Sequence, residues 1–362
     1  MRNAIIKVWR GESKPLKWFL YPLLFPLSCA YDICLYMRNI MYRSGFMKIH
    51  KVSVPVISIG NITLGGTGKT PVVGRLSEML IQAGFSPAIV TRGYKRKRKG
   101  TFLVDRDNDN AVDVGDEAFM LSKRTRLPVF VGTDRAQAII KGMDAFPIDV
   151  ALLDDGFQLR NLHKDIEILL IDCSEKNNNL NLFPLGPCRE RVERIQNADI
   201  IMTRNGSISG LLSRYTEGIP VFSFRYKPMY LCNLKHDLTG HYNFLKGKNV
   251  LAFSGLGNNK SFFDLLKGLG ANVIHEISYP DHYFYKNSDI KMLSGYHDAD
   301  VIVTTEKDAT KINRNEAPEN LYYLTVDVEI DNEEEMMKTI INKLSVVKYD
   351  LLERYDREIF YN

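Results

Sequence analysis

Cysteine is scarce in this chain, and none of it is spaced for metal binding or redox exchange. The five cysteines include no C-x-x-C pair; they are Cys29, Cys34, Cys173, Cys188 and Cys232. An odd number of cysteines without metal-site spacing is typical of reduced thiols in a cytosolic protein. A strong charge is also missing, because 48 Lys and Arg oppose 43 Asp and Glu and leave a net charge of +5. This small excess is compatible with anionic ligands or an anionic membrane surface and gives no reason to expect a nucleic acid partner.

The N-terminal region lacks the features of a cleaved secretory signal, because no small-residue cleavage site clearly follows its apolar stretch. That stretch, from Leu16 to Met37, is near the roughly 20 residues that a membrane-spanning helix needs. Pro22 and Pro26 interrupt it, and Asp32 lies inside it. These interruptions favour a helix that lies in the membrane interface over a clean span. A hairpin of core helices is the alternative interpretation.

The chain also lacks internal repeats and long low-complexity tracts, and its 362 residues suggest two domains of ordinary size. Short apolar runs alternate with helical patterns, which predicts a mainly parallel sheet covered by helices on both faces. In the first half, the expected strands cover residues 54–59, 88–91, 129–131, 150–153, 166–171 and 200–203. The expected helices there cover residues 70–83, 116–124 and 135–145.

A second alternation of strands and helices follows a break at residues 206–218. An aromatic stretch over 221–231 is expected to form an extended connector, and later strands are expected at 250–253, 273–277, 301–304 and 322–328, with helices at 262–269 and 288–296. We therefore predict a membrane-associating helical segment over 1–50, a nucleotide-binding core over 51–220, a C-terminal α/β domain over 221–346 and a tail over 347–362.

A glycine-rich loop lies between the first expected strand and its helix. It reads TLGGTGKT and consists of Thr63, Leu64, Gly65, Gly66, Thr67, Gly68, Lys69 and Thr70. Such a P-loop presents backbone N–H groups and a helix N-terminus to phosphate. Lys69 would reach the β- and γ-phosphates, and the Thr70 hydroxyl would bind Mg²⁺. The usual first glycine is replaced by Thr63, so the match to the general pattern is incomplete.

Two adjacent carboxylates, Asp154 and Asp155, directly follow the apolar run over 150–153. Nucleotide-bound Mg²⁺ usually takes an acidic ligand from the end of a neighbouring strand. The repulsion between two such carboxylates is also relieved by a cation. We therefore predict a magnesium site here, and a polar loop that caps a strand is the alternative.

Other features narrow the class of P-loop protein. A guanine-reading N-K-x-D string is missing, and Leu64 stands where the deviant ATPase loop has a lysine. Asp116 opens an expected helix, and Asp281 and His282 lie together in an aromatic loop. Each has a purely structural alternative, helix capping for Asp116 and a surface turn for His282.

Three arginines in loops could bind phosphate, or could form surface ion pairs instead. They are Arg92, Arg135 and Arg189, and Arg189 is followed by Glu190.

Together these motifs resemble the family of tetraacyldisaccharide 4′-kinases. The matching strings, in chain order, are GNITLGGTGKTP, TRGY, GDE, DDGFQ, FPLGPCRE, FSGLGN, the Asp281–His282 pair and TTEKD. A threonine at the first loop position, as at Thr63, is usual in that family. Two departures are visible: Leu159 stands where many members have histidine, and the run Lys95 to Lys99 replaces residues that are often glycine-rich.

The resemblance implies an α/β fold in which a three-layer α/β/α P-loop domain joins a smaller α/β domain through a two-stranded hinge. It implies transfer of the γ-phosphate of ATP, with Mg²⁺, to the 4′-hydroxyl of an acylated glucosamine disaccharide 1-phosphate, a lipid A precursor. Asp116 would then be the general base, His282 would orient it, and Lys69 would stabilise the transferred group. Arg189, Glu190, Arg92 and Arg135 would contact the acceptor.

Because the acceptor's acyl chains stay in the bilayer, the enzyme should work at the cytoplasmic face of the bacterial inner membrane, as a peripheral or singly anchored protein. Two alternatives remain open from the sequence. One is a P-loop kinase of another sugar or lipid. The other is a P-loop switch or ATPase that has no lipid kinase activity.

Overall fold

The computed structural model describes residues 9, 14–65, 68–173, 179–208 and 210–360. A single sheet of 13 strands runs through two lobes, in the order β11-β10-β12-β13-β8-β7-β6-β1-β5-β2-β4-β3, with β9 paired to β8. Most neighbouring strands within the lobes are parallel, as the alternation of strands and helices predicts. The predicted α/β fold class is therefore confirmed.

The N-terminal lobe is built on strands whose residues are nearly all buried, because helices cover both faces of a parallel sheet. Its central strands are β1 (Val56–Asn61), β5 (Val150–Asp154), β2 (Pro87–Thr91), β6 (Ile166–Asp172) and β7 (Ile200–Arg204), and its edge carries β4 (Val129–Val131) and β3 (Phe102–Leu103). One face is covered by α3 (Lys69–Gln82) and α5 (Asp116–Thr125), which follows the short α4 (Ala111–Val114). The other face is covered by α6 (Arg135–Ala145) and by the 3₁₀ segments η1 (Val192–Asn197) and η2 (Gly210–Tyr215).

The C-terminal lobe repeats this plan on a smaller scale. Its strands are β10 (Asn249–Ser254), β11 (Asn272–Ser278) and β12 (Val301–Thr305), with the short β9 (Thr239–His241) at the side. Its helices α7 (Asn259–Gly268) and α8 (Asn287–Ser294) bury apolar residues against opposite faces of the sheet. The short elements η3 (Tyr242–Leu245), α9 (Glu306–Ala309) and η4 (Arg314–Glu316) complete the lobe.

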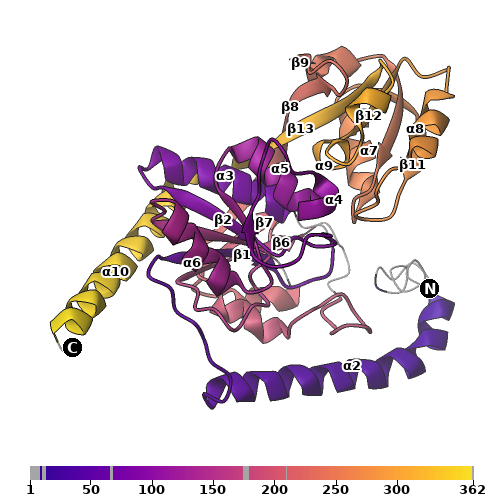
Figure 1. Cartoon of the computed structure of the whole chain (residues 1–362). Coiled ribbons are helices and arrows are strands. Elements are labelled where there is room, and N and C mark those ends of the chain that lie inside the picture. Colours follow the sequence, from indigo (N-terminus) through magenta and orange to yellow (C-terminus); the bar gives the residue numbers. More distant parts are fainter. Residues whose placement is uncertain (1–8, 10–13, 66–67, 174–178, 209, 361–362) are drawn as a thin grey trace.

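Two long antiparallel strands join the lobes (Figure 1). β8 (Val221–Asn233) begins beside β7 in the N-terminal lobe, and β13 (Leu321–Ile330) begins beside β12 in the C-terminal lobe. The connector predicted over 221–231 and the strand predicted over 322–328 therefore form the two-stranded hinge.

The last helix, α10 (Glu333–Phe360), returns to the N-terminal lobe (Figure 1). Met336, Ile340 and Leu344 are fully buried in the same core as Ile57 of β1. The predicted division of the chain into segments remains a prediction, but residues 333–345 pack with the N-terminal lobe and not with the C-terminal one.

The N-terminal helix α2 (Lys14–Arg43) runs along one side of the N-terminal lobe (Figure 1). Leu24 and Leu35 are buried, and Ser28 donates a hydrogen bond to the Leu182 carbonyl. The opposite side is apolar and exposed, with Trp18 at 82% and Phe19 at 81% exposure. Within the described residues, Trp18–Arg43 is the one helix long and apolar enough to cross a membrane. The helix is thus continuous through both prolines and leaves one apolar face unpaired.

Candidate active site

The P-loop follows β1 and leads into α3, which is the context that its sequence predicts. Its first half is fastened to a neighbouring loop, because Thr63 pairs with Cys188 and the Leu64 N–H donates to the Pro187 carbonyl at 2.7 Å. Gly65 and Gly68 both have positive φ, as a phosphate-cradling turn requires. Gly66 and Thr67 lie outside the described residues.

Gly68 is required for a second reason, which comes from the hinge. A Cβ at Gly68 would lie 1.9 Å from the hydroxyl oxygen of Tyr226, a residue of β8. Tyr226 is held by Arg204, whose guanidinium lies 4.8 Å from the centre of the tyrosine ring. The hinge strand thus packs directly against the last turn of the phosphate loop.

Lys69 and Asp155 lie at the centre of the predicted nucleotide site. The Lys69 ammonium is 3.5 Å from a carboxylate oxygen of Asp155 and 3.2 Å from the side-chain oxygen of Asn61. Arg189 donates to both carboxylate oxygens of Asp155, at 3.0 and 3.1 Å. Burial alone would raise the pKa of Asp155, but the charges of Lys69 and Arg189 outweigh it and lower the pKa to about 2.

Asp154 has the opposite environment. It is 3% exposed, and among the described residues neither of its carboxylate oxygens has a hydrogen-bond partner. Burial and the nearby charge of Glu117 raise its pKa to about 8. A buried carboxylate without a partner is costly unless a cation occupies its neighbourhood. Asp154 at the end of β5, with Thr70 buried at the start of α3, therefore fits a divalent cation.

The two lobes meet at Asp116 and His282. Asp116 begins α5 and is 2% exposed, while His282 lies in the loop after β11 with a left-handed φ of 58°. His282 Nδ1 lies 2.8 and 2.9 Å from the two carboxylate oxygens of Asp116. The ring of Tyr94 packs against the imidazole with 4.8 Å between centres. Backbone strain in a loop residue that makes such contacts is common at functional sites.

Two lysines of the C-terminal lobe add to this cluster. Lys307 lies 3.1 Å from Glu117, 3.5 Å from Asp281 and 3.7 Å from Asp116. Lys311 is 3.8 Å from Asp116. Burial would raise the pKa of Asp116, but His282 and the two lysines outweigh it and lower the pKa to about 2.

Of the remaining predicted site residues, Arg92 and Arg135 lie near each other, and Glu190 lies elsewhere, against α2. Arg92 is exposed at the carboxyl end of β2, and Arg135 is buried nearby, where it donates to the Thr133 carbonyl at 2.7 Å. Burial and the charge of Arg92 lower the pKa of Arg135 to about 10. Glu190 lies away from them, because its carboxylate binds Arg38 of α2 at 2.8 and 2.9 Å.

Sequence reasoning gave no role to three residues that the structure places at the site: Asn61, Glu117 and Lys307. Asn61 accepts from Lys69 and also contacts the Arg189 guanidinium. Each of the three stands inside a string that carries the family resemblance, GNITLGGTGKTP, GDE or TTEKD. Their position inside a matching motif is the sequence signal that could have identified them as site residues.

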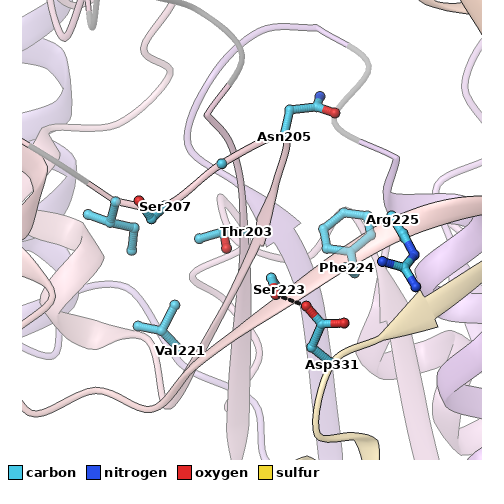
Figure 2. Close-up of a pocket in the computed structure, with 10 residues that line it drawn as sticks. Thr203, Asn205, Ser207, Val221, Ser223, Phe224, Arg225 and Asp331 are labelled. Carbon is cyan, nitrogen blue, oxygen red and sulfur yellow. Dashed lines mark hydrogen bonds between the residues drawn. The ribbon is translucent and has the colours of Figure 1, made fainter.

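A cavity opens beside the first part of β8 (Figure 2). It has a volume of about 440 Å³ and opens between β7, the first part of β8 and the turn before α10. Thr203, Asn205 and Arg225 line it, and Ser223 donates a hydrogen bond to Asp331 across it. None of the predicted site residues lines this cavity.

Comparison with known proteins identifies the family. Residues 20–345 match the family described as tetraacyldisaccharide-1-P 4′-kinase. The chain belongs to this family. It is 35% identical over 342 residues to a tetraacyldisaccharide 4′-kinase of Vibrio campbellii, covering 94% of this chain and 97% of that one. A relative of the same name from Aquifex aeolicus is 36% identical over 323 residues, covering 88% of this chain and 97% of that one.

A solved structure from this 4′-kinase family is also similar to the chain. The crystal structure of LpxK from Aquifex aeolicus in complex with ATP superposes with a TM-score of 0.73 at 32% identity, covering 91% of this chain and 99% of that one. The family resemblance drawn from the motifs is therefore confirmed. A P-loop switch without kinase activity is not favoured, because the whole two-lobed architecture is shared with the 4′-kinases.

Proposed function

We propose that this chain transfers the γ-phosphate of ATP to the 4′-hydroxyl of tetraacyldisaccharide 1-phosphate, which forms lipid IVA. One observation carries the proposal within the family. Both lobes build the Asp116–His282 pair, and Asp154 lies close enough to feel the charges of both Lys69 on the P-loop and Lys307 beside that pair, so nucleotide and acceptor can meet between the lobes. Phosphoryl transfer needs such positioning and charge neutralisation more than covalent chemistry.

The nucleotide end is formed by the N-terminal lobe. Lys69 would bind the β- and γ-phosphates, and its present contacts with Asn61 and Asp155 hold it at the loop. Thr70 and Asp154, with Asp155, would hold Mg²⁺, which when bound neutralises the charge of the phosphates. The contacts of Arg189 favour a role in fixing Asp155.

The acceptor end is formed by Asp116 and His282. With a pKa of about 2, Asp116 is ionised at neutral pH and can accept the proton of the 4′-hydroxyl. His282 orients the carboxylate by its hydrogen bond. Arg92 and the buried Arg135 are the nearest candidates for a phosphate of the acceptor, because they lie together at the carboxyl ends of the strands. Glu190 would act indirectly, by holding α2 through Arg38.

The exposed apolar side of α2 supports work at a membrane surface. Trp18, Phe19, Leu23, Leu27 and Ile33 all expose more than half of their side chains. An acylated acceptor leaves the bilayer only at a cost of about 0.8 kcal/mol per exposed CH₂ group. We place the enzyme at the cytoplasmic face of the bacterial inner membrane, with α2 as its peripheral or single anchor.

A single assay tests this function. The purified chain is incubated with radiolabelled ATP, Mg²⁺ and a defined acylated disaccharide 1-phosphate, and the lipid is then separated by chromatography. We expect label on the lipid, and much less when the acyl chains are removed. ATP hydrolysis without labelled lipid would overturn the proposal. Equal labelling of a soluble sugar would point to another kinase activity.

A further inference from the structure

Lys307 lies in the candidate active site, but the proposed phosphoryl transfer gives it no role. It lies on α9, a four-residue helix of the C-terminal lobe, and its ammonium group points to the N-terminal lobe. Three carboxylates from both lobes lie within 4 Å of it; they belong to Glu117, Asp281 and Asp116. Burial disfavours its charged form, but these acids outweigh burial and raise the pKa of Lys307.

The position of Lys307 relative to Asp116 decides what it can reach. If Asp116 accepts the proton of the attacking hydroxyl, that hydroxyl lies within about 3 Å of the carboxylate, and the γ-phosphorus lies about 3–3.5 Å beyond it. Lys307 Nζ is 3.7 Å from the same carboxylate. A flexible lysine at that distance can therefore reach an oxygen of the phosphoryl group in flight.

Lys311 provides the contrast, because it is fixed and enclosed. Its side chain is 0% exposed and is held by Asp308 at 2.7 Å, and Asp308 in turn accepts from the Gly255 N–H and from Thr305. Among the described residues, the ion pairs of Lys307 that are shorter than its 3.7 Å distance to Asp116 are those with Glu117 and Asp281, whose side chains are 30% and 24% exposed. Lys311 is thus a permanent counter-charge, whereas Lys307 can exchange its partners for a ligand.

We propose that Lys307 is a catalytic residue that the C-terminal lobe delivers to the transferred γ-phosphoryl group. The inference rests on the proposed phosphoryl transfer. As the acceptor oxygen bonds to the γ-phosphorus and the bond to the β,γ-bridging oxygen breaks, Lys307 donates a hydrogen bond to a non-bridging oxygen and keeps its own proton. The acceptor proton goes to Asp116, and the electron pair stays on the β-phosphate of ADP.

This arrangement gives each lobe one cation for the reacting phosphates. Lys69 stays with the nucleotide on the P-loop, and Lys307 arrives with the lobe that carries His282. Phosphoryl transfer is then fast only when the lobes are together, because one of the two lysines that face the reacting phosphates comes from the second lobe.

The test compares Lys307→Met with wild type in the full-length protein, using radiolabelled ATP and the acylated disaccharide 1-phosphate. We expect kcat to fall about 10²- to 10³-fold, the cost of one lost donor to a transition-state charge. The KM for ATP should stay unchanged, because Lys69 and the loop bind the nucleotide. Binding of ADP with aluminium fluoride in the presence of acceptor should weaken, while binding of ADP alone should not.

The matched control is Arg124→Met, because Arg124 also joins the lobes next to Lys307. It contacts Glu306 at 3.5 Å, Asp327 at 3.0 Å and the Val326 carbonyl at 2.6 Å, all away from Asp116. If Lys307 only clamped the lobes, both variants would lose similar activity, and aluminium fluoride binding would fall equally in both. That result, or full turnover by Lys307→Met, would overturn the inference.

Failure of the proposed function looks different, since wild type itself would then leave the lipid unlabelled. If Lys307→Met does not fold, Lys307→Gln and Lys307→Arg decide the question. We expect Lys307→Arg to recover part of kcat and Lys307→Gln to recover none. Equal activity of these two variants would contradict a role for the charge.

Discussion

Asp154 and Asp155 are neighbours in the chain but have opposite proton affinities. Asp155 receives two hydrogen bonds from Arg189 and lies beside Lys69, so its pKa falls to about 2. Asp154 is enclosed without a partner among the described residues, so its pKa rises to about 8. A fold selected only for stability would not retain an unpaired carboxylate in its core.

The cost of that carboxylate can be measured. Asp154→Asn should raise the free energy of unfolding by about 1–3 kcal/mol, because folding above pH 3.8 must either bury the charge of Asp154 or make it take up a proton, and asparagine needs neither. It should also abolish lipid phosphorylation. The measurement is urea unfolding followed by circular dichroism in metal-free buffer, with Asp155→Asn as the control. Asp155→Asn should destabilise the protein, because it leaves the charges of Arg189 and Lys69 without a carboxylate partner. A destabilised Asp154→Asn would contradict this account.

The Asp116–His282 contact predicts how stability depends on pH. The pKa of Asp116 is lowered from 3.8 to about 2, so its ionised form stabilises the folded state at pH values above 3.8. That contribution is lost as the pH falls through about 2. Wild type should therefore lose about 2 kcal/mol more stability than Asp116→Asn between pH 5 and pH 2. Urea midpoints at both pH values check this, and equal losses in the two proteins would refute it.

At the scale of elements, α2 differs from the other helices because its exposed side is apolar. Polar contacts at its inner side fasten it to the loop over 182–191, including the pair between Arg191 and Asp32 at 2.8 Å. Changing Trp18 and Phe19 to Ser should weaken binding to phospholipid vesicles by up to about 10³-fold, since each aromatic contributes about 2 kcal/mol on full burial. Flotation with vesicles measures this. Ile81→Ser, an exposed apolar residue of α3, is the matched control and should bind as wild type does.

Elements with a long, regular pattern could be predicted from the sequence, and short or unusual ones could not. The helix expected over 135–145 coincides with α6, and the strand expected over 129–131 coincides with β4. α9 has four residues and therefore too few positions to show a helical period. For that reason Lys307 had no predicted role, although its string TTEKD was recognised.

The pairing of Asp116 with His282 shows a different limit. The two residues are 166 positions apart, and no periodicity connects them. The family resemblance predicted that His282 acts on Asp116, while the residues alone left open a helix cap for Asp116 and a surface turn for His282. Their distance follows from the register of the hinge strands and from how the lobes pack, which are tertiary properties that a local pattern does not contain.

At the scale of the whole molecule, the two lobes share one sheet. The hydrophobic core of the N-terminal lobe is completed by residues that follow position 220 in the chain. Its core includes residues beyond 220, contributed by β8, β13 and α10; they are Phe222, Phe224, Val328, Ile330, Met336, Ile340 and Leu344. Motion between lobes must therefore bend the hinge beyond these anchored residues, on the side of the C-terminal lobe.

This architecture predicts that a fragment of residues 51–220 does not fold. Loss of a single large core side chain costs about 2–5 kcal/mol, and a domain has only about 5–15 kcal/mol in total. The fragment loses all seven of these side chains and exposes the edge of β7. A second fragment, in which 51–226 is joined by a flexible linker to 327–347, restores them and should unfold cooperatively on heating. If the shorter fragment unfolds cooperatively, this prediction is wrong. The boundary at residue 220 would then separate two independent folding units, and the packing of α10 on the N-terminal lobe would not be needed to form its core.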